Sequence, residues 1–316
     1  MSKEEALHFL EEETPDSKET QKPWKLLIVD DDPGVHAVTK LALSHLVFAG
    51  RAIEFISAFS SVEARQIIAF HPDAAVVLLD VVMESEEAGL ELVRFIRDDL
   101  QNSAVRIILR TGQPGQVPEA KVVIDYDIND YKTKTELTSQ RLFTAVITAL
   151  RGFRDIHEIH ATKRGLEQVA HATTQLLRCP DRSAFARQAL EQLALLLHLE
   201  RNTHYTDAPG FMAILEGSDF ILEAGTGSFS QDAAKPLAQV DNAKIQASVK
   251  AALAAQTSLL DGQWVVLVLE SARVAPCLLV MESPRALAGW QRSVLEIFAA
   301  NMTALCANLS CRLPAS

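Results

Sequence analysis

The chain has 316 residues, 48% of them hydrophobic, a size and composition that favour two domains with separate cores. Its formal net charge of −11 disfavours a nucleic-acid-binding surface, so we expect no DNA partner. The acidic N-terminus is unlike a signal peptide, and no apolar run reaches the roughly 18–20 residues of a membrane span. We therefore expect a cytoplasmic protein without membrane contact, whose four cysteines are reduced thiols.

Residues 1–23 are expected to form an acidic, solvated tail. Beyond it, apolar runs alternate with helical patterns as far as residue 150. The predicted strands are Leu26–Val29, Ile53–Ala58, Ala74–Leu79, Val105–Leu109 and Ile128–Tyr131. The predicted helices are Pro33–Phe48, Ser60 or Ser61 to His71, Glu87–Asp98, Glu119–Ile124 and one that begins near Thr138. This alternation predicts an α/β domain over residues 24–150, with a doubly wound, five-stranded parallel sheet.

In such folds, ligands gather beyond the carboxyl ends of the strands. Asp30, Asp80 and Thr111 follow the first, third and fourth predicted strands, and Lys134 lies just past the fifth. Carboxylates, a hydroxyl and an amine at one sheet edge predict a pocket in which a carboxylate accepts a phosphoryl group. We predict Asp80 as the nucleophile, Lys134 as a fixed cation and Thr111 as a hydrogen-bond donor to the bound phosphoryl group.

A carboxylate can approach an anionic phosphoryl group only if a divalent cation offsets their repulsion. Asp31 and Asp80 are predicted as direct ligands of this ion, and Asp30 as a ligand acting directly or through water. The backbone carbonyl of Val82 can complete the coordination. An all-oxygen site of this kind suits Mg²⁺.

Four sequence motifs carry a resemblance to a known family. They are LLIVDDDPG at Leu26–Gly34, VVLLDVVM at Val76–Met83, IILRTG at Ile107–Gly112 and DYKTK at Asp130–Lys134. Through them, residues 25–150 resemble the receiver domain of bacterial two-component response regulators. The resemblance implies a flavodoxin-like fold, Asp80 as phosphoacceptor, Asp30 and Asp31 as the acidic metal pair, and a sensor histidine kinase or phosphotransfer protein as partner.

The resemblance also implies roles for residues on the fourth and fifth strands. Thr111 would be the switch hydroxyl, Tyr131 the switch aromatic residue and Lys134 the conserved-type lysine. Lys132 has the same strand parity and competes with Lys134 for that role, and Tyr131 can alternatively be a simple core residue.

Three positions depart from the receiver pattern. Glu84 replaces a proline, an extra residue separates Asp80 from Gly89, and Thr135 replaces the proline that normally follows the lysine. A cis bond before threonine costs about 3–4 kcal/mol, so we expect either a rearranged loop or stored strain there. These departures put the partner's identity and the dephosphorylation rate in doubt.

The fifth helix is predicted to continue as a connector over residues 151–164. Apolar residues with 4-3-4-3 spacing begin at Leu142 and end at Ile156, which indicates either a coiled-coil-like seam or packing on the helix's own sheet. His157 and His160, with His171 further on, are interpreted as exposed side chains rather than metal ligands.

Residues 165–316 show the element order of an α+β domain. The predicted helices are Leu166–Leu177, Ser183–Leu197, Asn242–Ala254 and Ala288–Leu309. The predicted strands are Phe211–Leu215, Phe220–Ala224, Thr257–Leu260, Gln263–Glu270 and Cys277–Met281. The 3-4-3-4 spacing of apolar residues from Leu295 to Leu309 indicates packing on this sheet or a homodimer seam.

The stretches VVLVLE at Val265–Glu270 and MESPRALAGWQRSVLEIFAANMTALCANLS at Met281–Ser310 are similar to GAF-like regulatory domains that precede HD-GYP cyclic-di-GMP phosphodiesterases. No cyclic-nucleotide signature is visible, and Trp264 and Cys277 are interpreted as core residues. Neither an HD-GYP nor a GGDEF motif appears, nor a DNA-binding helix pair. We therefore predict a chain that is not an enzyme and lacks its effector domain.

Three hypotheses for function follow. The first is a response regulator that acts through protein–protein contact or oligomerisation. The second is the regulatory half of an HD-GYP phosphodiesterase, with a partner in cyclic-di-GMP signalling. The third is a phosphatase of the haloacid-dehalogenase type, which Asp30-x-Asp32 loosely fits, although Asp32 is equally explained as a helix cap before Pro33.

Overall fold

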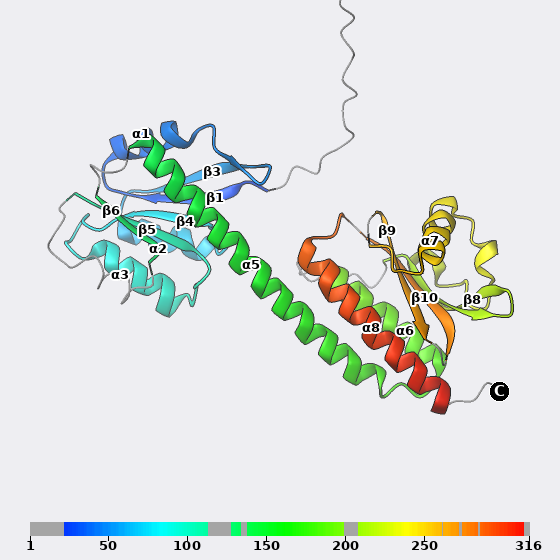
Figure 1. Ribbon diagram of the computed structural model, residues 1–316. Coiled ribbons are helices and arrows are strands. Elements are labelled where there is room, and N and C mark those ends of the chain that lie inside the picture. The colour runs from blue at the N-terminus through cyan, green and yellow to red at the C-terminus, as the bar shows by residue number, and fades with distance from the viewer. Residues whose placement is uncertain are drawn as a thin grey trace, which may run out of the picture. The chain divides into compact units, whose positions relative to one another are not determined.

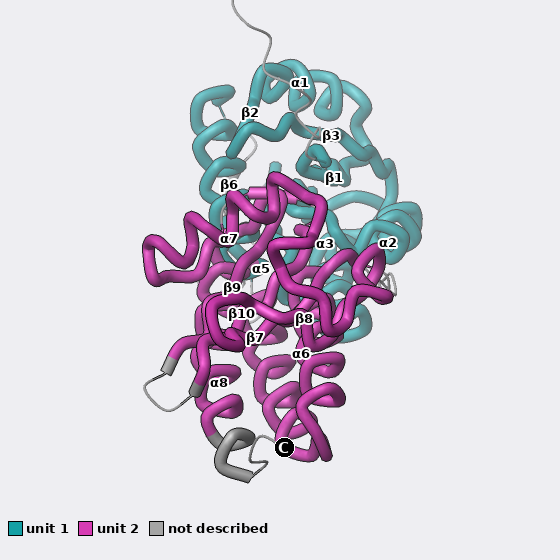
Figure 2. Tube along the Cα trace, turned by 90° about the vertical axis from the view of Figure 1, so that its right-hand side faces the viewer, with its two compact units in different colours: residues 1–157 teal, residues 158–316 magenta. Residues whose placement is uncertain are grey.

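The computed structural model describes residues 22–112, 128–133, 138–198, 208–260, 262–271, 274–283 and 285–312 (Figure 1). The chain forms two compact units, residues 1–157 and 158–316 (Figure 2). Helix α5 (Ser139–Leu176) contributes to both units. Among the helices of the described ranges, none combines the length and the apolar character that crossing a bilayer requires.

Unit 1 contains a sheet of six described strands in the order β2-β3-β1-β4-β5-β6. Their bounds are β1 Trp24–Val29, β2 Val47–Phe48, β3 Arg51–Ala58, β4 Val76–Asp80, β5 Arg106–Thr111 and β6 Asp130–Thr133. All neighbours pair in parallel except β2, which is antiparallel to β3 at the edge. Counted along the chain, the parallel strands follow the order 2-1-3-4-5, which is flavodoxin-like. The predicted α/β fold is therefore confirmed, with one short added strand.

The helices of unit 1 cover both faces of this sheet. They are α1 Pro33–Leu43, α2 Ser61–Phe70, α3 Ala88–Arg94 with a π-helical turn at Phe95–Asp99, and the first part of α5. Alternate strand residues enter two cores, because successive side chains of a strand point to opposite faces. Leu26 and Ile28 of β1 lie in the core shared with α5, and Leu27 and Val29 in the core shared with α2 and α3.

Several predicted boundaries in unit 1 are wrong. The first helix ends at Leu43 rather than Phe48, because Ala49 and Gly50 (φ 51° and 74°) form a two-residue turn that joins β2 to β3. The helix predicted to reach Asp98 becomes π-helical at Phe95. The fifth parallel strand is Asp130–Thr133, and the helix predicted at 119–124 lies outside the described residues.

Unit 2 has an antiparallel sheet in the order β8-β7-β10-β9, which confirms the α+β prediction. The strands are β7 Gly210–Glu216, β8 Asp219–Thr226, β9 Trp264–Ser271 and β10 Val274–Glu282. The helices are α6 Arg182–Leu197, α7 Ala243–Ala255 and α8 Gly289–Arg312, with 3₁₀ turns η2 Gly227–Phe229 and η3 Leu237–Gln239. One sheet face packs on α6, α8 and the end of α5, and the other packs on α7.

The strands predicted on either side of Gly217 are confirmed and pair as a hairpin, since Glu216 pairs with Asp219. The strand predicted at Thr257–Leu260 is wrong, because only Leu259 pairs there, in an isolated bridge with Val266. Trp264 and Cys277 are buried, as the core interpretation requires.

The apolar residues predicted to form seams on α5 and α8 pack against the core of their own unit. Leu142, Val146, Ala149 and Phe153 of α5 are buried on the sheet of unit 1. Leu295, Phe298, Met302 and Leu305 of α8 are buried in the core of unit 2. The two helices predicted on either side of residue 165 are a single helix, because Gly165 is accommodated within α5.

Two glycines of unit 1 give opposite predictions for the same substitution. Gly89→Ala would place a Cβ 2.2 Å from the Asp80 carbonyl oxygen, so we expect unfolding to become easier by about 1–3 kcal/mol. Gly152→Ala, inside α5, meets only Arg106 Cδ at 3.4 Å and should stabilise the protein by about 0.5–1 kcal/mol. Urea unfolding followed by circular dichroism tests both, and equal destabilisation by the two variants would contradict this packing.

Candidate functional site

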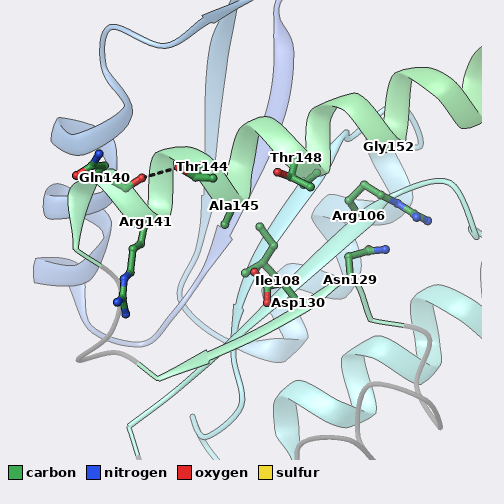
Figure 3. A pocket seen from close by; sticks show the side chains of 11 residues that line it. Arg106, Ile108, Asn129, Asp130, Gln140, Arg141, Thr144, Ala145, Thr148 and Gly152 are labelled. Atoms are coloured by element: carbon green, nitrogen blue, oxygen red, sulfur yellow. Dashed lines mark hydrogen bonds between the residues drawn. The ribbon is translucent and has the colours of Figure 1, made fainter.

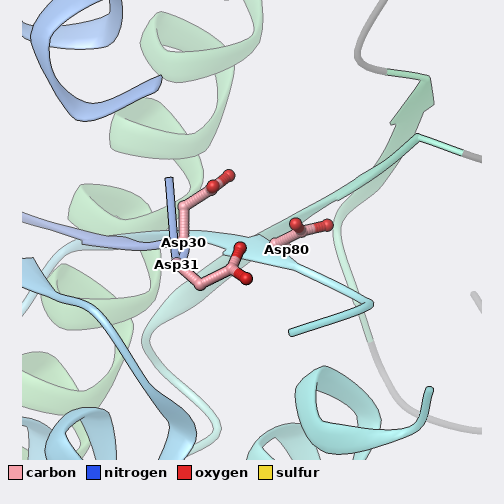
Figure 4. A group of neighbouring side chains, drawn as sticks. All are labelled: Asp30, Asp31 and Asp80. Carbon is pink, nitrogen blue, oxygen red and sulfur yellow. The ribbon is translucent and has the colours of Figure 1, made fainter. Parts of the chain in front are cut away.

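Three carboxylates meet at the carboxyl edge of the parallel sheet (Figure 4). Asp30 and Asp31 follow β1 directly, and Asp80 is the last residue of the fully buried β4. One oxygen from each residue lies within 4.8 Å of the others. Asp30 and Asp80 are 0% and 3% exposed, whereas Asp31 is exposed. Carboxylate oxygens at this spacing fit a hard divalent cation such as Mg²⁺.

Arg110 is a residue of this site that sequence reasoning missed. It lies on β5 beside Asp80 in the parallel register, and its side chain is buried. Its guanidinium donates to Asp30 Oδ2 at 3.3 Å and to Thr39 Oγ1 of α1 at 3.1 Å. Burial lowers the pKa of Arg110, while the carboxylates of Asp30 and Asp80 oppose that shift. The visible signal was a charged residue directly after the apolar run Ile107–Leu109.

His36 is a second missed residue. It lies on the inner face of α1, stacks on Phe59 at 4.4 Å and is 3% exposed. Its Nε2 is 2.8 Å from the backbone oxygen of Asp30, and its Nδ1 is 3.0 Å from Ser57 Oγ. A carbonyl can only accept, so Nε2 is the donor in the bond to the Asp30 backbone. His36 thus fixes the backbone that carries the first carboxylate.

Asp32 caps α1, as predicted. Its Oδ1 accepts from the backbone N–H of Gly34 at 2.7 Å, and Pro33 occupies the first helical position. Its own backbone N–H donates to Asp30 Oδ1 at 3.1 Å. A carboxylate committed to a helix cap weighs against the Asp30-x-Asp32 phosphatase motif.

The structure brings some of the other predicted residues to the same edge. Thr111 ends β5 and is 3% exposed, and Val82 lies two residues beyond Asp80 and is 38% exposed. Tyr131 and Lys132 belong to β6, paired with Leu109 and Arg110, but their side chains are not described. Lys134 and Thr135, where we expected either a rearranged loop or stored strain, lie outside the described residues.

Glu84, for which the resemblance predicted a departure from the receiver pattern, connects the loop after β4 to the start of α2. Its Oε1 accepts from the Ser61 backbone N–H at 2.9 Å and from the Ser61 hydroxyl. Burial raises the pKa of Glu84, but the hydrogen bonds from Ser61 and from backbone N–H groups outweigh it, so the pKa lies below its ordinary value of 4.5. Glu84 is therefore a polar tether between the loop after β4 and the start of α2.

A pocket of about 810 Å³ lies elsewhere in unit 1, between α5 and the strands β5 and β6 (Figure 3). Its lining includes Arg106, Asn129, Asp130 and Arg141, and none of the three clustered carboxylates. The Thr144 hydroxyl donates to the Gln140 carbonyl within it at 3.0 Å. The pocket is thus separate from the predicted site.

Comparison with known proteins gives matches to both units. Residues 146–312 match the family described as Domain of unknown function (DUF3369). A relative from Vibrio cholerae serotype O1 (strain ATCC 39315 / El Tor Inaba N16961), named 3'3'-cGAMP-specific phosphodiesterase 2, is 46% identical over 186 residues. That match covers 59% of this chain and 36% of the relative, so the chain spans about a third of the relative's length.

Two of the solved structures that this chain matches are named as receiver domains. One, a signal receiver domain from Clostridium thermocellum, is 18% identical with a TM-score of 0.36, covering 40% of this chain and 97% of its own. Another, the signal receiver domain of an HD domain-containing protein from Pseudomonas fluorescens Pf-5, is 22% identical with a TM-score of 0.36, covering 42% and 98%. The fold assignment of unit 1 rests on its own strand order.

The relative from Vibrio cholerae overturns one prediction. The sequence led us to expect that the protein is not an enzyme, because no motif of an output enzyme was visible. That prediction is wrong, since a relative that is 46% identical over 186 residues is named as a phosphodiesterase.

The hydrogen bonds of the Glu84 tether predict that the free energy of unfolding depends on pH. A carboxylate whose pKa is lowered on folding stabilises the folded state above its unfolded pKa, and this contribution is lost as the pH falls through the folded value. The difference in unfolding free energy between wild type and Glu84→Gln should therefore shrink as the pH falls from 7 to below the ordinary value of 4.5. Urea unfolding across this range measures it.

Ser61→Ala is the matched variant for this experiment, because it removes one hydroxyl donor to Glu84 and should weaken the same pH dependence. A difference between wild type and Glu84→Gln that stays constant with pH would contradict the tether.

Proposed function

The chain belongs to the family described as Domain of unknown function (DUF3369), and from this premise we propose that it is the phosphorylation-controlled part of a response regulator. Asp80 accepts a phosphoryl group from a sensor histidine kinase or a phosphotransfer protein. The second domain, which we propose to be GAF-like, passes the change on through protein–protein contact or oligomerisation. The observation that carries the proposal is the cluster of Asp30, Asp31 and Asp80 at the carboxyl edge of a flavodoxin-like sheet.

The geometry gives each residue of the site a part in this reaction. Asp80, at the end of a buried strand, presents its carboxylate as the nucleophile. Asp31 and Asp80 would hold Mg²⁺, together with the Val82 carbonyl, and Asp30 would do so directly or through water. When bound, the ion supplies the positive charge that lets two anions approach. Thr111 would bind the phosphoryl group, with Tyr131 and Lys134 as the further switch and charge partners.

Helix α5 supplies a route between the two units. Its first part packs on the sheet of unit 1 through Val146 and Phe153, and its last part packs in the core of unit 2 through Val169 and Leu176. If α5 moves relative to the core of one unit, it therefore strains the core of the other unit, since packed cores resist continuous deformation. This continuity supports signalling along α5.

The similarity to the Vibrio cholerae relative favours a specific output. We propose that the protein controls the hydrolysis of a cyclic dinucleotide, with this chain corresponding to the regulatory part of a phosphodiesterase. The proposal keeps cyclic-di-GMP or a related cyclic dinucleotide as the signalling partner. The haloacid-dehalogenase alternative is not favoured, because Asp32 is engaged as a helix cap.

Phosphorylation tests the first part of the proposal. With acetyl phosphate and Mg²⁺, wild type should gain one phosphoryl group in an intact-mass spectrum, and Asp80→Asn should gain none, because the nucleophilic carboxylate is gone. Asp98→Asn, an exposed aspartate of the same unit, is the matched control and should behave as wild type. Identical spectra for all three proteins would contradict the proposal.

The second part predicts control of phosphodiester hydrolysis. In a phosphodiesterase whose regulatory part is this chain, as proposed, beryllofluoride with Mg²⁺ should change the rate of 3'3'-cGAMP hydrolysis, because it mimics a phosphoryl group on Asp80. Asp80→Asn should abolish this response while Asp98→Asn retains it. Chromatographic assay of the linear product measures the rate, and a response that persists in Asp80→Asn would count against the link.

A further inference from the structure

The backbone and the carboxylate of Asp30 both have polar partners. Its backbone N–H donates to the Ala58 carbonyl at 3.2 Å, and its carbonyl lies 2.8 Å from His36 Nε2. Its Oδ1 accepts from the Asp32 backbone and its Oδ2 from Arg110. Its side chain is 0% exposed.

In Figure 4 the side chains of Asp30 and Asp31 leave the end of β1 in different directions. Asp31 is exposed, so it can meet an ion from solvent without breaking such contacts.

The Asp30–Arg110 ion pair changes the charge that the site offers to a metal. Three carboxylates carry −3, and the guanidinium of Arg110 reduces the sum to −3 + 1 = −2. The pair is almost fully buried, with side-chain exposures of 0% and 5%, so solvent screens it little. A divalent ion bound directly to Asp30 Oδ2 would lie next to the guanidinium, and the two cations would repel each other.

We propose that Arg110 is a fixed counter-ion of the phosphoryl site, which holds Asp30 out of direct metal coordination and sets how tightly the site binds its divalent ion. The inference rests on the proposed function and deepens it. Arg110 is a positioning residue: it donates to Asp30 and to Thr39 of α1, and so it keeps the acidic site folded when no metal is bound. Asp31 and Asp80 are then the carboxylates that bind the ion.

Calorimetric titration of the full chain with MgCl₂ tests this assignment. Arg110→Met restores the third net negative charge and should tighten Mg²⁺ binding by at least about tenfold. Asp30→Asn combined with Arg110→Met keeps the net charge of wild type, and should leave the affinity within about threefold. Asp31→Asn removes a direct ligand and should weaken binding by more than about tenfold. Arg141→Met, an exposed arginine of unit 1, controls for lost charge and should have no effect.

Thermal unfolding without metal gives an independent readout. Arg110→Met leaves a buried carboxylate without its cation, and the unfolding midpoint of unit 1 should fall by about 10 °C. The double variant removes both charges and should recover at least half of that loss. If Arg110→Met does not fold, the double variant still decides, because its Mg²⁺ affinity is predicted to match wild type.

The outcomes separate this inference from the proposed function. An unchanged Mg²⁺ affinity in Arg110→Met would show that Arg110 does not set the affinity of the site, and would overturn the inference. A loss of more than about tenfold in the double variant would show Asp30 to be a direct ligand, and would overturn it as well. An unfolding midpoint that the double variant fails to recover would overturn the counter-ion role without reference to metal. Failure of wild type to accept a phosphoryl group would instead overturn the proposed function.

Discussion

Repulsion among like charges is the constraint on which the site depends. A parallel sheet brings the ends of neighbouring strands together, and here Asp30, Asp31 and Asp80 meet within 4.8 Å. Two of them are almost fully buried, so water screens their repulsion weakly. Arg110 offsets part of this charge from the next strand, and the rest is available to attract a metal ion. The same charge balance therefore governs both the folding of this edge and its proposed chemistry.

Most of the fold could be predicted from the sequence, because buried parallel strands read as continuous apolar runs. The runs at Leu26 and Val76 show this clearly. The strand β2 was missed, since its turn uses Ala49 and Gly50, whereas Asn-Gly or Asp-Gly is the recognisable signal for left-handed backbone. The continuity of α5 was also missed, because Gly165 reads as a helix end although here it gives close packing against Val294.

Only the site residues at the carboxyl ends of predicted parallel strands could be predicted from the sequence. Asp80 and Thr111 each end a strand, and topology alone places them at one edge. Arg110 was not predicted, because its contact with Asp30 joins two strands that are distant in the sequence. His36 is close to Asp30 in the sequence, but the helical pattern of α1 does not show that its ring reaches the Asp30 carbonyl. A charged or polar residue on an otherwise buried face was the available signal. The similarity to a phosphodiesterase could not be predicted from residue patterns, since it came from comparison with a longer relative.

In the proposed reaction, Asp80 becomes phosphorylated beside an ion held by Asp31 and Asp80, while Asp30 stays paired with Arg110. A crystal structure of the full chain with Mn²⁺ and beryllofluoride measures this most directly, because anomalous scattering locates the metal. We predict beryllium on the Asp80 carboxylate, manganese bound by Asp31 and Asp80, and the Asp30–Arg110 pair intact. Manganese bound to Asp30 with Arg110 displaced, or beryllofluoride absent from Asp80, would contradict the account.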